Sequence, residues 1–200
     1  YLQFMKKIFI FLFVFCNFIS FSQITVDKTT PNDNPTYLID NVLLGGGVVA
    51  SNHSYEGDSM QIGFFNAVNT SLGLDSGIVM ATGDIDNLMP GTISFTNPAN
   101  IVTDPDLLNV ANSVPGMIGQ SFTVSSINDV AKLEFDFIPT SDTITFRYVF
   151  GSQEYFAFEN TQYNDVFGFF LSGPGISGPY ANGSINLAIV PGSDPPLPIT

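Results

Sequence analysis

Apolar and polar residues alternate in two neighbouring stretches of the chain, residues 133–138 and 143–150. A period of two is typical of a β-strand with one solvated face. Residues 139–142 between them are rich in turn formers, so the two stretches are predicted to pair as an antiparallel hairpin. In that hairpin Arg147 would face Glu134 or Asp136 across the strands.

A third apolar run, residues 165–171, carries aromatic side chains on both faces and Gly168 at its centre. This pattern predicts a strand that is buried on both sides or closely approached by another backbone. Apolar runs bounded by turn residues predict further strands at 48–54, 61–66, 77–82, 118–124 and 185–190. A helix is predicted at 36–44, with Thr36 as its cap and three glycines after its end; its apolar face would comprise Leu38, Ile39, Val42 and Leu43.

The composition agrees with a β-rich fold. The chain has 20 Phe, no Trp, 18 Gly and 13 Pro, and only 12% of its residues are charged. We therefore expect an all-β, mainly antiparallel structure, a jelly-roll-like β-sandwich with one short N-terminal helix.

The first 22 residues have the pattern of a signal peptide. Met5, Lys6 and Lys7 precede an apolar run at 8–19, and small residues follow it at the cleavage position. Residues 23–200 would then form a single domain, and we expect that domain to be incomplete at its C-terminal end, because the chain stops in a Pro-rich loop.

Removal of the signal peptide changes the charge of the protein. The whole chain has a formal net charge of −13, and the loss of two lysines leaves three basic against 18 acidic residues, a net charge of −15. This balance disfavours nucleic acids and anionic membranes as partners. Cys16 is the only cysteine and lies within the signal segment, so the remaining chain has no disulfide.

Two blocks of sequence carry a family resemblance. The run FRYVFGSQEY at 146–155 and the run YNDVFGFFLSGPGI at 163–176 are similar to the signature of the choice-of-anchor L family of Bacteroidetes-type surface proteins. The likeness extends through LLGGGVVASN, GIVMATGDI and NLAIVPG, but Gln153 stands where the family usually has an acid. The resemblance implies secretion and display on a cell surface, by anchoring segments outside this chain.

Carboxylates are the remaining candidates for chemistry. Loop carboxylates form the sites of hard cations, so calcium is a candidate cofactor, although no stretch matches the twelve-residue calcium loop and turn residues are the simpler interpretation. The candidate ligands are Asp84, Asp86, Asp104, Asp106, Glu154 and Asp165.

Enzymatic readings of the sequence have less support. Glu154 and Asp165 are a candidate acid and base pair for glycoside hydrolysis. His53 is the lone histidine, and with no cysteine after the signal segment a structural zinc site is not expected. No sequence motif identifies a Ser-His-Asp triad that would include His53.

The sequence therefore predicts a non-enzymatic, extracellular module for adhesion or surface scaffolding. Its partners would be a cell-surface protein or a glycan, and the mature chain is expected to contain no transmembrane span. A calcium-dependent carbohydrate-binding module and a secreted hydrolase with a carboxylate pair are the alternatives.

Overall fold

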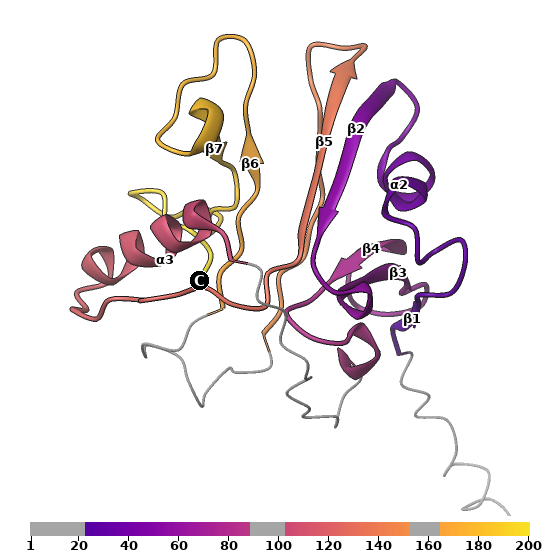
Figure 1. Ribbon diagram of the computed structural model, residues 1–200, viewed down its shortest axis with the longest axis horizontal. Coiled ribbons are helices and arrows are strands. Elements are labelled where there is room, and N and C mark those ends of the chain that lie inside the picture. Colours follow the sequence, from indigo (N-terminus) through magenta and orange to yellow (C-terminus); the bar gives the residue numbers. More distant parts are fainter. Residues whose placement is uncertain (1–22, 89–102, 153–164) are drawn as a thin grey trace, which may run out of the picture.

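The computed structural model describes residues 23–88, 103–152 and 165–200, and its regular structure is mainly antiparallel β-sheet with short helices (Figure 1). The strands of this part of the chain are β1 (Thr25–Asp27), β2 (Val48–Glu56), β3 (Ile62–Asn66), β4 (Ser76–Met80), β5 (Lys132–Pro139), β6 (Phe170–Leu171) and β7 (Ile185–Asn186). The helical segments are α2 (Pro35–Leu38), η1 (Ile39–Leu43), η2 (Ser59–Gln61), η3 (Ile85–Leu88), α3 (Pro105–Met117) and η4 (Ala181–Gly183). The predicted β-rich, antiparallel class is confirmed.

A three-stranded sheet in the order β1-β3-β4 has the most buried strand at its centre. In β3, Ile62 is 1% exposed and Phe65 is 7% exposed. Gly63 lies where a Cβ atom would come within 2.8 Å of the Asp27 carbonyl oxygen, so a side chain here would collide with β1. The strands predicted at 61–66 and 77–82 are confirmed, with ends shifted by one or two residues.

The predicted N-terminal helix forms, but with a different start and a change of pitch. Asn34 is the cap: its Oδ1 accepts hydrogen bonds from Thr36 N at 2.9 Å and Tyr37 N at 3.3 Å. The prediction of Thr36 as the cap was wrong, because Pro35 already takes the first helical position. From Ile39 the helix continues as the π-helical segment η1, in which Leu44 N donates to Ile39 O.

The change of pitch alters the face that the helix buries. Leu38 and Ile39 are completely buried, as predicted, whereas Leu43 is 37% exposed. A π-turn uses about one residue more than an α-turn, which rotates Leu43 away from the face begun by Leu38.

The longest ladder is a two-stranded ribbon of β2 and β5, which we call the β2–β5 ribbon. Its register runs from Val48 opposite Pro139 to Glu56 opposite Lys132. The strands predicted at 48–54 and 133–138 are confirmed, but the predicted hairpin between 133–138 and 143–150 was wrong. The hydrogen-bonding partner of β5 is β2, and residues 143–150 are assigned to no strand.

Arg147 consequently has a different neighbour from the one expected. Its Nη2 donates to the Gly73 carbonyl oxygen at 2.6 Å, so the predicted contact with Glu134 or Asp136 was wrong.

Helix α3 was not predicted from the sequence. Asp104 caps it, with Oδ1 accepting from Asp106 N at 2.9 Å and Leu107 N at 3.0 Å, and Pro105 begins it. Its buried side chains include Val110 and Ala111, and Ala111 belongs to a small core cluster with Ile127 and Val130.

The strand predicted at 118–124 was wrong, since no strand is assigned there. The Asn112 side chain on α3 replaces a partner strand for Val124: its Oδ1 accepts from Val124 N at 2.8 Å and its Nδ2 donates to Val124 O at 3.0 Å. The backbone of Val124 is thus satisfied without a ladder.

Aromatic rings hold the segments 143–150 and 165–171 together, although only Phe170 and Leu171 are assigned to a strand. Phe146 lies 4.9 Å from Phe169 and Tyr148 lies 5.3 Å from Phe167, as centroid distances. On the other side of the segment 165–171, a Cβ at Gly168 would come within 2.8 Å of Leu107 Cδ2. The strand predicted at 165–171 is confirmed only at Phe170 and Leu171, and the prediction that it is buried on both sides or closely approached by another backbone was wrong: residues 165–171 are all partly exposed, and side-chain atoms surround Gly168.

The C-terminal segment contains less strand than expected. Of the strand predicted at 185–190, only β7 is assigned, paired with β6 from Phe170 opposite Asn186 to Leu171 opposite Ile185. Ile189 makes an isolated antiparallel bridge with Pro198.

Candidate functional site

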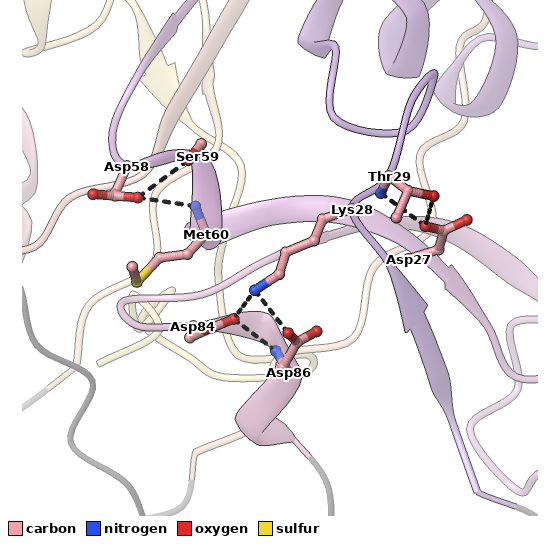
Figure 2. Close-up of polar contacts among 8 residues, drawn as sticks. All are labelled: Asp27, Lys28, Thr29, Asp58, Ser59, Met60, Asp84 and Asp86. Atoms are coloured by element: carbon pink, nitrogen blue, oxygen red, sulfur yellow. Dashed lines mark hydrogen bonds and ion pairs between the residues drawn. The ribbon is translucent and has the colours of Figure 1, made fainter.

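Two of the predicted cation ligands meet at the end of β1. Lys28 directly follows β1, and Asp84 directly precedes η3, which contains Asp86. Figure 2 shows Lys28 Nζ between the two carboxylates: it is paired with Asp84 Oδ1, and it lies 2.8 Å from Asp86 Oδ2. We call these three residues the Lys28 cluster. Asp84 and Asp86, two of the candidate cation ligands, thus lie on either side of a lysine ammonium group.

The pKa values of Asp84 and Lys28 favour the charged form of each side chain. Burial by itself would raise the pKa of Asp84, but hydrogen bonds from Lys28 and from Asp86 N, with the charge of Lys28, hold it below its ordinary value. Burial by itself would lower the pKa of Lys28, but the hydrogen bonds and charges of both carboxylates raise it. Over the range between these two pKa values, Lys28 and Asp84 form an ion pair.

The carboxylates next to this cluster shape turns. Asp27 Oδ1 accepts from Thr29 N at 2.8 Å and from Thr29 Oγ1 at 2.6 Å, and these bonds, with one from Asn32, lower the pKa of Asp27 (Figure 2). Asp58 caps η2, with Oδ1 accepting from Met60 N at 3.0 Å (Figure 2). Both side chains therefore stabilise local backbone.

A second lysine gathers carboxylates from three elements. Lys132 Nζ lies 3.4 Å from Glu56 Oε2 on β2, 3.5 Å from Glu134 Oε2 on β5 and 3.7 Å from Asp104 Oδ2 at the start of α3. Burial by itself would lower the pKa of Lys132, but these three carboxylates raise it. This Lys132 cluster connects the β2–β5 ribbon to α3.

The predicted pair Asp104 and Asp106 does not act as a pair. Asp104 caps α3 and faces Lys132, whereas Asp106 accepts from Ala181 N at 3.0 Å through Oδ2. Burial of Tyr180, together with the charge of Asp106, raises the pKa of that tyrosine. The two carboxylates hold different parts of the chain to α3.

The lone histidine lies at a β-bulge. The register of the β2–β5 ribbon shifts between Ser51 and Ser54, and Asn52 there has a φ of 54°. His53 Nε2 lies 3.0 Å from Asp40 Oδ1 on η1, and the imidazole is only 15% exposed. The bulge directs His53 towards the helix, so this pair connects η1 with β2.

The last two candidates are only partly described. Glu154 lies outside the described residues, and Asp165 Oδ2 accepts from Ser152 Oγ at 3.4 Å. Within the three described ranges no group of three or more His, Cys, Asp or Glu side chains is placed to hold a metal ion. Calcium binding by the six carboxylates, and hydrolysis by Glu154 and Asp165, stay predictions. The predicted signal peptide also lies outside the described residues.

Comparison with known proteins identifies the family. The model of the choice-of-anchor L domain matches residues 25–200. The chain belongs to the choice-of-anchor L domain family. No curated protein and no solved structure matches it significantly.

Membership in the choice-of-anchor L family indicates a surface-associated or extracellular protein, from a family not known for catalysis. In the part of the chain that the structure describes, no helix is long and apolar enough to cross a membrane.

Sequence reasoning missed the role of the lysines. Lys28 and Asp84 are 56 residues apart in the chain, and no local pattern connects them. One signal was available: Lys28, Lys132 and Arg147 are the only basic residues after position 22, among 18 acids. Each lysine in such a chain is expected to attract several carboxylates.

Proposed function

We propose that this choice-of-anchor L domain is a non-enzymatic module displayed on the outer surface of the producing cell, where it serves adhesion or surface scaffolding. Residues 1–22 would direct its export through the secretory route, and anchoring would be supplied by segments outside this chain. Its partner would be a protein or a glycan of a cell surface.

The observation that supports this proposal is the use of the polar side chains. Asp84 and Asp86 hold Lys28, Asp104 caps α3, and the lone histidine is paired with Asp40. Groups that would serve as acid, base or metal ligand in an enzyme are here engaged in holding segments together. A module with this arrangement contributes surface for contact.

Two measurements test the proposal. An antibody against the full chain should label intact producing cells as strongly as permeabilised cells, and a strain that lacks the protein should attach less to host or neighbouring cells. Labelling that requires permeabilisation would contradict display, and unchanged attachment together with turnover of a glycoside would contradict a non-enzymatic role.

The jelly-roll-like architecture and the two alternative functions are further proposals, and each alternative function predicts a distinct binding or activity result. A jelly-roll-like sandwich would assemble from the small sheets described above. A calcium-dependent carbohydrate-binding module predicts glycan binding that is lost with a chelator. A hydrolase predicts glycoside turnover that is lost in both Glu154→Gln and Asp165→Asn.

A further inference from the structure

The outer face of the β2–β5 ribbon exposes an apolar pair. Val49 on β2 is directly opposite Ile138 on β5, and they are 63% and 70% exposed. These are the two most exposed large apolar side chains in the described part of the chain. Two such side chains in contact are expected to favour burial by a partner.

The same face continues as a row of acids. Towards the other end of the ribbon Asp136 is opposite Ser51 and Glu134 is opposite Ser54. Asn52 Nδ2 donates to Asp136 Oδ2 at 2.6 Å, which fixes this carboxylate on the face. Glu134 has a 59% exposed side chain, and its lysine neighbour is shared among three carboxylates. The face is therefore negative beside its apolar end.

The location of this face makes it accessible. The end of the ribbon where β2 begins and β5 ends lies away from the three-stranded sheet (Figure 1). No residue of β2 or β5 is fully buried, although this ladder is the longest of the described sheets. Backbone pairing thus holds the strands together while their outer side chains remain in solvent.

We propose that the outer face of the β2–β5 ribbon binds a basic polypeptide that presents an apolar side chain next to its positive charges. This inference rests on the proposed surface display and names the chemistry of the partner. The net charge of the chain argues against a second copy as the partner. A second copy has a formal net charge of −13, or −15 without the signal segment, so the negative face of the ribbon would repel it. A basic partner is attracted by Asp136 and Glu134, and its apolar side chain covers Val49 and Ile138.

The spacing on the ribbon specifies the partner further. Residues on one face of a strand recur about every 7 Å. In an extended segment that lies along β5, an apolar side chain would contact Ile138. Basic side chains at the second and fourth positions after it would face Asp136 and Glu134. The expected binding sequence is therefore an apolar residue, any residue, a basic residue, any residue and a basic residue.

A defined peptide tests this proposal. The probe is a fluorescein-labelled peptide that repeats leucine, threonine, lysine, threonine, lysine, and its binding to the full chain is followed by anisotropy. We expect Val49→Ser/Ile138→Ser to weaken binding about tenfold, since the apolar contact is lost. We expect Glu134→Gln/Asp136→Asn to weaken it similarly at about 30 mM salt and to remove most of the difference between about 30 mM and about 300 mM salt.

Matched controls accompany these variants. Val68→Ser removes an apolar side chain that is 50% exposed outside the ribbon, and Asp194→Asn removes an exposed acid near the C-terminus. Both should bind the peptide as the unchanged chain does, and circular dichroism should show that all four variants are folded.

Three outcomes would overturn the proposal. They are no binding of the peptide at about 1 mM, equal binding by the ribbon variants and the controls, and a dimer in sedimentation that Val49→Ser/Ile138→Ser dissociates. The last outcome would make a second copy the occupant. None of them bears on surface labelling of cells, so failure of this proposal is distinct from failure of the proposed function.

Discussion

The β1-β3-β4 sheet and the β2–β5 ribbon use the same antiparallel pairing for opposite purposes. The central strand β3 has five residues, and three of them, Ile62, Gly63 and Phe65, are buried. The ribbon strands have nine and eight residues, and none of them is buried. The length of a ladder therefore does not indicate where the core lies.

The difference follows from what covers each sheet. The side chain of Ile85, which is completely buried, reaches the backbone of β3 beside Gly63, and the Lys28 cluster ties η3 to the end of β1. The outer face of the ribbon has no such cover among the described residues: it exposes Val49 and Ile138. Stability is expected to depend on the sheet, and recognition on the ribbon.

The largest effect is expected from Ile62→Ala in β3. Deletion of a side chain that is 1% exposed leaves a cavity, so the free energy of unfolding should fall by about 2–5 kcal/mol in urea titrations. The matched control is Ile138→Ala in the ribbon, which should change it by about 0.5 kcal/mol or less. Similar losses for the two variants would show that the ribbon belongs to the core.

A smaller effect is expected from Lys28→Met, which removes the cation from Asp84 and Asp86. Because the Lys28 side chain is 27% exposed, we expect a loss of about 1 kcal/mol in the free energy of unfolding at pH 7. Arg147→Met is the control, since Arg147 is exposed and donates to a backbone carbonyl; it should cost less. Equal costs would contradict a special role for the Lys28 cluster.

The Lys28 cluster also predicts a pH dependence. The pKa of Asp84 lies below its ordinary value of 3.8 in the folded protein, so its stabilisation is present above 3.8 and is lost as the pH falls through the folded value. The pKa of Lys28 lies above its ordinary value of 10.5, so its stabilisation is present below 10.5 and is lost as the pH rises through the folded value. In thermal unfolding, the Tm of Asp84→Asn should fall less than the Tm of the unchanged chain as the pH drops below 3.8 and as it rises above 10.5. An equal change of Tm with pH in the two proteins would contradict a contribution of the Lys28–Asp84 pair to stability.

The strands were predictable where the local sequence carries the signal. Residues 133–138 alternate between apolar and polar, residues 61–66 form a short apolar run, and both became strands. The partner of β5 was not predictable, because the local sequence does not specify whether β5 pairs with the adjacent run 143–150 or with the distant β2, and the choice depends on long-range packing.

Helix α3 and the lysine clusters were missed for different reasons. Pro115 and Gly116 near the end of α3 hid its periodicity, and Asp104 was interpreted as a cation ligand instead of a helix cap. The sequence singled out Asp84 and Asp86 as candidate cation ligands, and the structure places both beside Lys28 Nζ. Its lysine partner arrives from 56 residues away, and no sequence spacing predicts that.

Calcium provides a sharper test of the same pair. Lys28 occupies the space between Asp84 and Asp86, so if these carboxylates are calcium ligands, Lys28→Met should expose them. We expect about 10 mM calcium to raise the Tm of Lys28→Met by about 1–2 °C more than that of the unchanged chain. Magnesium serves as the control cation, and an equal response of both proteins would exclude this pair as the site.

The most direct measurement is the free energy of unfolding of Val49→Ser/Ile138→Ser in urea, compared with the unchanged chain. The ribbon exposes both side chains, so the loss is expected to be about 0.5 kcal/mol or less. A loss of about 2 kcal/mol or more would mean that these side chains are packed within the protein, and would contradict a ribbon that presents its outer face to a partner.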